Sequence, residues 1–235
     1  MRKAGKAMND IFRKELKYVI TQEQFWDIKS RLGVLMEQDE HSTDGSYMVR
    51  SQYYDSITDA DLKDNLDGVW EKQKIRVRVY SPNATVAKLE YKCKKGSDGI
   101  KYSMQLNREE VLRLENHQYD FLLERKEELA HRLYVKMTEE YYRPKTIIEY
   151  RRTAFLYPVS DVRITFDRNL RASSNPYGIL EETPGYFPLL NADKVVMEIK
   201  YNDFLPTFLK EITTSVDASA EAYSKYSIAR LNYIY

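Results

Sequence analysis

The sequence feature that most constrains the fold is a pair of alternating charged and apolar runs between Glu71 and Lys95. Cationic side chains take every second position of the first run, and Ile75, Val77 and Val79 lie between them. The second run alternates in the same way. Because side chains i and i+2 of a strand point the same way, each run is predicted to form a strand with one charged and one apolar face.

Paired as a hairpin around a turn at residues 81–83, the two strands would bring seven cations and one carboxylate to one surface. These residues are Lys72, Lys74, Arg76, Arg78, Lys88, Lys92 and Lys94, with Glu90. Like charges about 4 Å apart repel by about 1 kcal/mol per pair even in water. The pattern therefore predicts that an anion binds this surface and offsets the repulsion.

Composition restricts where such a basic site can be. The 235 residues carry a net charge of only +1, so the site has to be local and balanced by acidic residues elsewhere.

The single cysteine, Cys93, excludes an internal disulfide and a multi-cysteine metal site, and it predicts a reducing, cytoplasmic location. The sequence contains no apolar run of about 18 residues, so no membrane span is predicted. No linker or internal repeat divides the chain, so one domain over residues 1–235 is expected.

Further elements follow from the same periodicities. Strands are predicted over residues 12–20, 47–55, 100–106, 146–157, 161–167 and 195–201. A capping box at Thr21 with Gln24 predicts the start of a helix over 21–35, and an Asx-type start at Asn107 with Glu110 predicts a helix over 107–138 that is broken near residue 116. Two more helices are expected over 206–214 and 220–233, and residues 168–193 are typical of a long loop.

Charged faces recur on strand after strand, for example at Glu15 with Lys17 and at Glu198 with Lys200. One such face is typical of a solvated sheet surface. Their repetition favours an α+β fold in which about eight antiparallel strands close into a barrel, with apolar faces outward under flanking helices and charged faces lining a wet interior. Arginine and lysine neutralise phosphate oxygens, and carboxylates supply the oxygen ligands that Mg²⁺ or Mn²⁺ prefer.

Eight short motifs match a known family in order along the chain. They are ELKY (15–18), SQYYD (51–55), RVRVY (76–80), LEYK (89–92), YRRTAF (150–155), VRITFD (162–167), MEIK (197–200) and SKY (224–226). With them the sequence resembles the polyphosphate polymerase (VTC) domains of the triphosphate tunnel metalloenzyme superfamily, which is also called CYTH-like. The resemblance implies a tunnel open at both ends, ATP as the γ-phosphate donor, a requirement for Mn²⁺ or Mg²⁺, and inorganic polyphosphate as the product.

The resemblance and the strand faces together assign the candidate site. Catalytic candidates are Arg76, Arg78, Lys92, Arg152, Arg163 and Lys200. Phosphate-binding candidates are Lys17, Lys74, Lys88, Lys101 and Lys225. Metal-binding candidates are Glu198, Glu90 and Glu15. The superfamily's opening motif, ExExK, reads here as RKELK over residues 13–17, and the loss of its first glutamate argues against the triphosphatase and cyclase branches.

Phosphoryl transfer needs positioning and charge neutralisation more than a protein nucleophile, which suits a ring of cations with one metal. Three alternatives stay open: a triphosphate or nucleotide hydrolase in the same tunnel, a polyphosphate-binding module without activity, and an RNA-binding sheet. Tyr18 and Tyr91 fall on the faces opposite the cations, which argues against stacked RNA bases, so no nucleic-acid partner is expected. A membrane partner and the oligomeric state are left open.

Overall fold

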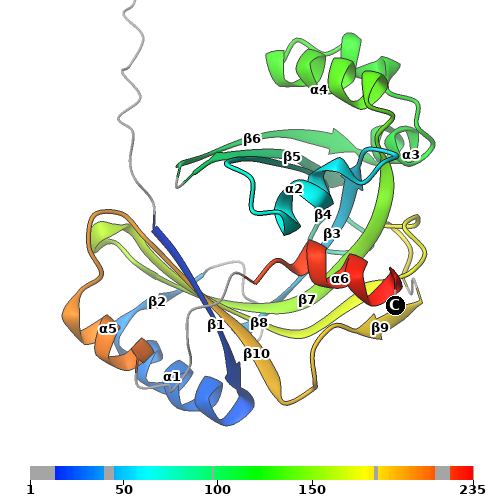
Figure 1. Ribbon diagram of the computed structural model, residues 1–235. Helices are drawn as coiled ribbons and strands as arrows, with labels where there is room; N and C mark the ends of the chain where they lie inside the picture. The colour runs from blue at the N-terminus through cyan, green and yellow to red at the C-terminus, as the bar shows by residue number, and fades with distance from the viewer. Residues whose placement is uncertain (1–13, 40–44, 97, 183–184, 215–222, 235) are drawn as a thin grey trace, which may run out of the picture.

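The computed structural model describes residues 14–39, 45–96, 98–182, 185–214 and 223–234. Ten strands of this part of the chain form one antiparallel sheet, with helices against it, so the α+β class is confirmed (Figure 1). The strands are β1 (Lys14–Thr21), β2 (Glu37–Gln38), β3 (Tyr47–Asp55), β4 (Glu71–Val79), β5 (Val86–Lys95), β6 (Asp98–Asn107), β7 (Arg143–Tyr157), β8 (Val162–Ser173), β9 (Tyr186–Pro188) and β10 (Lys194–Tyr201). The α-helices are α1 (Gln22–Leu35), α2 (Ala60–Leu66), α3 (Arg108–Glu115), α4 (Glu128–Glu139), α5 (Thr207–Thr214) and α6 (Lys225–Ile234).

The sheet curls without closing. Its strand order is β1-β10-β8-β7-β3-β4-β5-β6, with β2 beside β7 and β9 beside β8. In the described chain β1 and β6 are the two ends of this order and are not hydrogen-bonded to each other. Strands β4, β5 and β6 arch over β7, β8 and β10, which gives the sheet a deep concave face (Figure 1). The predicted closed eight-stranded barrel is therefore not confirmed: the structure is an open, curled sheet of ten strands.

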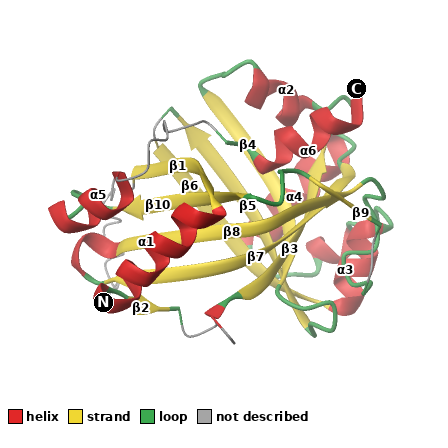
Figure 2. Ribbon diagram, turned by 90° about the horizontal axis from the view of Figure 1, so that it is seen from below, coloured by secondary structure: helices red, strands yellow, loops and turns green. Residues whose placement is uncertain are grey.

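Helices α1, α3, α4 and α5 cover the convex face, as the apolar strand faces predict. Helix α1 lies along β8 and β10, where Phe25 and Leu32 pack with Phe166 and Met197 (Figure 2). Helices α3 and α4 contribute to a second apolar cluster with β4, β5 and β6. Burial of these side chains leaves the charged faces on the concave side, since successive side chains of a strand alternate.

Local signals in the sequence set the helix starts correctly. Thr21 Oγ1 accepts from the backbone N–H of Gln24, whose side chain accepts from the backbone N–H of Thr21, at 3.2 and 2.8 Å. Asn107 and Glu110 form the same reciprocal pair at the start of α3. The loop expected over residues 168–193 is wrong in part, because β8 continues to Ser173 and β9 lies within it.

The C-terminal helix α6 lies against the concave side of the sheet, next to α2 and β7 (Figure 1). Tyr226 stacks on Tyr53 of β3, with ring centroids 5.3 Å apart, and donates a hydrogen bond to Asp55. Among the described residues no helix is both long and apolar enough to cross a membrane. The cytoplasmic location and the single domain over residues 1–235 stay predictions.

Candidate functional site

Strands β4 and β5 form the predicted hairpin, and its charged residues share one face. Lys72 lies opposite Lys94, Lys74 opposite Lys92, Arg76 opposite Glu90 and Arg78 opposite Lys88. The intervening Ile75 and Val77 are completely buried on the convex side. The hairpin thus contributes a row of cations, here called the cationic ladder (Lys72, Lys74, Arg76 and Arg78 of β4), to the concave face.

Glu90 is the carboxylate that binds the two arginines of this row and Lys101 of β6. Arg76 Nε donates to Glu90 Oε2 at 2.6 Å, Lys101 Nζ of β6 donates to Oε1 at 2.9 Å, and Arg78 Nη1 lies 3.8 Å away. Glu90 is only 3% exposed. Burial alone would raise its pKa, but Arg76, Arg78 and Lys101 lower the pKa to about 2. Glu90 is therefore ionised at any physiological pH, and its oxygens are occupied by cations.

A second cluster lies on β1 and β10, where Glu15 is opposite Lys200 and Lys17 is opposite Glu198. Lys17 Nζ is 2.8 Å from Glu15, and Lys200 Nζ is 2.5 Å from Glu198 and 3.7 Å from Glu15. Burial raises the pKa of Glu198, but Lys200, Lys225 and Lys17 outweigh it and hold that pKa well below its usual range. Lys200 thus contacts both carboxylates, so Glu15 and Glu198 are near neighbours.

A third cluster surrounds Asp167 of β8, which sequence reasoning did not single out. Arg152 of β7 donates two parallel hydrogen bonds to it, from Nε to Oδ1 at 2.7 Å and from Nη2 to Oδ2 at 2.8 Å. Lys225, the first residue of α6, lies 2.8 Å from Oδ2. Burial would raise the pKa of Asp167, yet the two cations lower it. Asp167 thus fixes one cation from the sheet and one from the helix.

Arg163 of β8 has one partner from outside the predicted strands and one from the start of β3. Its Nη2 donates to Asp39 at 2.8 Å and to the Tyr47 hydroxyl at 3.2 Å. Its Nε is buried and has no hydrogen-bond partner among the described residues. The same holds for Oγ1 of Thr165, which lies directly opposite Glu198 in the sheet. Buried polar atoms without partners are rare, and on a charged concave face they favour a polar ligand.

Tyrosines from β3, from the residue after β4 and from α6 stand between the cations. Lys74 Nζ lies 5.7 Å from the ring centroid of Tyr53 and 5.6 Å from that of Tyr226. Burial, partly offset by Tyr53, lowers the pKa of Lys74 to about 8. Lys88, at the far end of the hairpin, lies 5.6 Å from the ring of Tyr80. Tyr53 lies opposite Arg76, and sequence reasoning missed it because Arg50, the cation of its strand, has the opposite parity.

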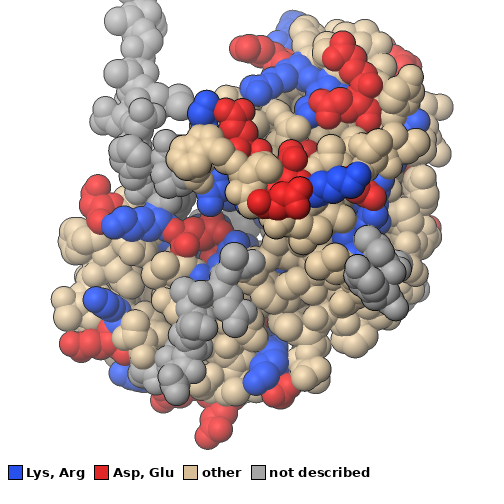
Figure 3. Space-filling view, in the orientation of Figure 1, with Lys and Arg blue, Asp and Glu red and all other residues tan. Residues whose placement is uncertain are grey.

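All eleven predicted cations and all three predicted metal-binding glutamates thus lie on the concave face or at its rim. Figure 3 shows basic and acidic side chains gathered around the hollow between the two halves of the sheet. The described residues contain no group of three or more His, Cys, Asp or Glu side chains that could hold a metal ion by themselves. A metal here would need other oxygen ligands, such as phosphate.

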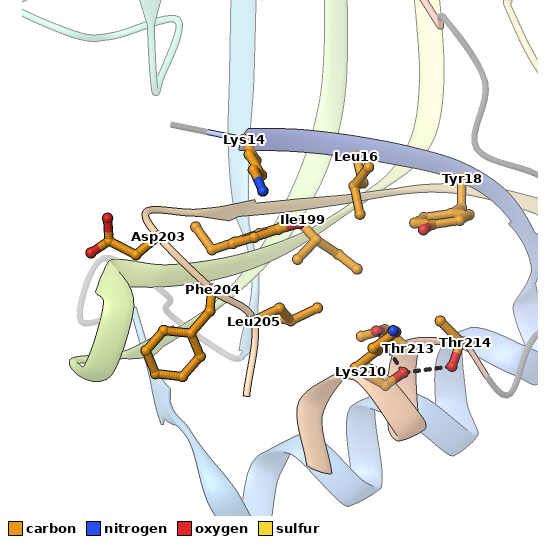
Figure 4. A pocket seen from close by; sticks show the side chains of 11 residues that line it. Lys14, Leu16, Tyr18, Ile199, Asp203, Phe204, Leu205, Lys210, Thr213 and Thr214 are labelled. Carbon is orange, nitrogen blue, oxygen red and sulfur yellow. Dashed lines mark hydrogen bonds between the residues drawn. The ribbon is translucent and has the colours of Figure 1, made fainter. Parts of the chain in front are cut away.

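Another hollow, of about 290 Å³, lies on the opposite side of β1 and β10. Leu16, Tyr18 and Ile199 line it together with residues of α5 and the segment before α5 (Figure 4). None of the predicted site residues lines this hollow. It belongs to the convex face and is separate from the cationic clusters.

Comparison with solved structures identifies the fold. A candidate adenylate cyclase from Bacillus halodurans is 12% identical over 91% of this chain and 96% of its own, with a TM-score of 0.53. A candidate adenylate cyclase from Vibrio parahaemolyticus is 12% identical over 94% of this chain and 98% of its own, with a TM-score of 0.51. At this identity the likeness shows only that these proteins share the fold of this chain.

The sequence itself identifies the family of this chain. The family model described as the VTC domain matches residues 12–233, and the chain belongs to the VTC domain family. The resemblance stated from the motifs is thereby confirmed. No curated protein matches this sequence.

Proposed function

We propose that this chain transfers the γ-phosphate of ATP to a growing chain of inorganic polyphosphate on the concave face of its sheet. The observation that carries the proposal is the excess of cations: the eleven predicted lysines and arginines have five carboxylates as partners there. The cations are Lys17, Lys74, Arg76, Arg78, Lys88, Lys92, Lys101, Arg152, Arg163, Lys200 and Lys225, and the carboxylates are Glu15, Asp39, Glu90, Asp167 and Glu198. An elongated polyanion matches this excess and its distribution over eight elements.

The carboxylates explain how so many cations are held in place without a ligand. Glu90 positions Arg76 and Lys101, and Asp167 positions Arg152 and Lys225. Each cation is then available to a phosphate oxygen at little cost in side-chain entropy, because its position is already fixed. Arg76 and Arg152 would neutralise the charge that spreads over the transferring phosphoryl group.

In the reaction, a terminal oxygen of the acceptor polyphosphate attacks the γ-phosphorus of ATP in line with the departing group. A phosphorus–oxygen bond to the acceptor forms, the bond between the γ-phosphorus and the β,γ-bridging oxygen breaks, and ADP leaves. The acceptor oxygen is already ionised at neutral pH, so this step requires no protein base. A reaction that needs no base agrees with a face rich in guanidinium and ammonium groups.

A divalent cation fits best between Glu15 and Glu198. Lys200 contacts both carboxylates, and the hydroxyl of Thr165, which has no hydrogen-bond partner among the described residues, lies opposite Glu198. Glu90 fits less well, because Arg76, Arg78 and Lys101 already bind its oxygens. When bound, Mn²⁺ or Mg²⁺ would neutralise charge on the phosphates. Lys200, which contacts both carboxylates, would have to turn toward the phosphates.

The test is a polymerisation assay with the purified chain, ATP, Mn²⁺ or Mg²⁺ and a short polyphosphate primer. We expect polyphosphate that grows with time on gels, with one ADP formed for each phosphate added. Release of inorganic phosphate without chain growth would instead assign hydrolysis to the same face. Binding of polyphosphate with no turnover of ATP would leave only the binding module.

A further inference from the structure

An exposed tryptophan stands at the end of the cationic ladder. Trp70 is 68% exposed and comes two residues before Lys72. The backbone N–H of Gly96 donates to the carbonyl of Trp70 at 2.8 Å, which extends the β4–β5 pairing by one step beyond Glu71 and Lys95. By strand parity the indole therefore shares the face of Lys72 and Lys94.

The indole is held on one side by Gly96, the residue across the hairpin. A Cβ atom at Gly96 would lie 2.3 Å from Cη2 of Trp70, so only glycine leaves room for the ring. Gly96 also has a φ of +58°, which glycine adopts without steric cost. Packing of an aromatic ring over a cross-strand glycine fixes the ring and leaves its other surface open to solvent.

Two unpaired ammonium groups stand next to this ring. Trp70, Lys72, Lys94 and Gly96 line a hollow of about 130 Å³ together with Gly68 and Val69. Lys72 and Lys94 are directly opposite each other, an arrangement that is destabilising for like charges. Neither forms an ion pair with a described carboxylate, whereas the adjacent Glu71 and Lys95 pair at 2.7 Å on the other face. A bound anion would relieve the repulsion between the two lysines.

We propose that this hollow binds the nucleoside end of ATP. The nucleobase stacks on the open surface of Trp70, and Lys72 and Lys94 hold the adjoining phosphate. The remaining phosphates then follow the ladder toward Lys74 and Lys92. This inference rests on the proposed function and adds a means of discrimination to it. The hollow recognises the base of the nucleotide, which polyphosphate lacks. It therefore distinguishes ATP, the phosphate donor, from polyphosphate, the product.

The first experiment uses Trp70 as its own reporter. The chain has two tryptophans, so Trp26→Phe leaves Trp70 as the only one. We expect ATP to quench its fluorescence in a saturable way, because stacking on a base quenches indole emission. Inorganic tripolyphosphate should compete with ATP yet cause no quenching of its own. If tripolyphosphate and ATP change the emission equally, base stacking on Trp70 is wrong.

The second experiment compares Trp70→Ala with Trp70→Phe by calorimetric titration. Base–aromatic stacking of the usual strength predicts that Trp70→Ala weakens ATP binding roughly five- to a hundredfold, while tripolyphosphate affinity stays within about twofold. Trp70→Phe should recover most of the ATP affinity. Equal losses for both ligands in Trp70→Ala, or no loss for ATP, would overturn the inference. A wild-type chain that binds neither ligand would overturn the proposed function itself.

Discussion

Lys92 Nζ on β5 lies 3.7 Å from Glu15 Oε2 on β1, although these strands belong to opposite ends of the sheet order. The ion pair spans a gap that no backbone hydrogen bond between β1 and β6 closes in the described chain. Both side chains are partly exposed, so the pair by itself contributes at most about 1 kcal/mol. An anion that binds Lys92 together with Lys17 and Lys200 would link the two ends far more strongly.

Tripolyphosphate is therefore expected to stabilise the fold. At a concentration a hundredfold above its Kd, binding adds about 2.7 kcal/mol to the free energy of unfolding, which raises the Tm of a chain of this size by roughly 5–10 °C. A thermal-shift titration measures this. Lys92→Met should reduce the shift, whereas Lys210→Met, which removes an exposed lysine of α5 on the convex side, should not. An equal reduction in both variants would contradict a ligand that bridges β1 and β5.

Arg76→Ala should lower polyphosphate synthesis at least a hundredfold, because it removes a fixed guanidinium from the proposed path of the phosphates. Glu90 keeps Arg78 and Lys101 as partners, so the free energy of unfolding should fall by only about 1–3 kcal/mol. Rates of synthesis and urea denaturation measure the two effects. Arg31→Ala on the exposed side of α1 is the matched control, expected to be close to wild type in both. Full activity in Arg76→Ala would exclude this role.

Glu198→Gln should raise the Mn²⁺ concentration needed for half-maximal activity about tenfold or more, since it removes one of two neighbouring carboxylates. Glu90→Gln should behave differently. It leaves three cations with a weaker partner, so it should lower the free energy of unfolding by about 3 kcal/mol with little change in the metal requirement. Metal titrations of activity, together with denaturation curves, separate the two glutamates. A larger metal effect in Glu90→Gln would move the metal site to the hairpin.

Asp61 of α2 should make stability depend on pH. Burial and the neighbouring Asp55 raise its pKa to about 7, against hydrogen bonding from Tyr142 and the charge of Lys136, with a smaller contribution from Glu140. Between the unfolded pKa near 4 and about 7, the folded chain holds a proton that the unfolded chain has lost. The free energy of unfolding therefore falls as pH rises through this window, by up to roughly 4 kcal/mol.

Asp61→Asn tests this directly, because asparagine keeps an oxygen acceptor for Tyr142 and cannot ionise. We expect the variant to be more stable than wild type at pH 8 and close to it at pH 4.5. Urea denaturation at the two pH values measures the difference. A constant difference between the two proteins across the range would show that Asp61 does not titrate as proposed.

Sequence reasoning succeeded where local periodicity decides the outcome. Alternation placed Arg76 and Arg78 on one face and Ile75 and Val77 on the other, because the side-chain period of a strand is fixed by its backbone. Whether the sheet closes into a barrel could not be predicted in this way. Barrel closure depends on the twist summed over many strand pairs and on the register at both ends of the sheet. Alternation within one strand gives no information about either.

The residues that sequence reasoning missed are mostly partners rather than ligands. Asp167 ends a motif that was recognised, but its role depends on β7, β8 and α6 meeting in space. Asp39 lies outside the predicted strands, far along the chain from Arg163. Tyr53 lies on the face opposite Arg50, the cation of its strand, so strand parity gave no sign of it. All three required knowledge of which elements are neighbours, which a single sequence does not contain.

The pairing of β1 with β10 has a consequence for how the protein is made. Lys14 pairs with Tyr201, so β1 has no partner strand until synthesis has reached β10. Contacts so distant along the chain slow folding. During synthesis, β1 with its apolar Leu16, Tyr18 and Ile20 therefore stays unpaired while residues 22–193 are made, and its open edge is then an aggregation hazard.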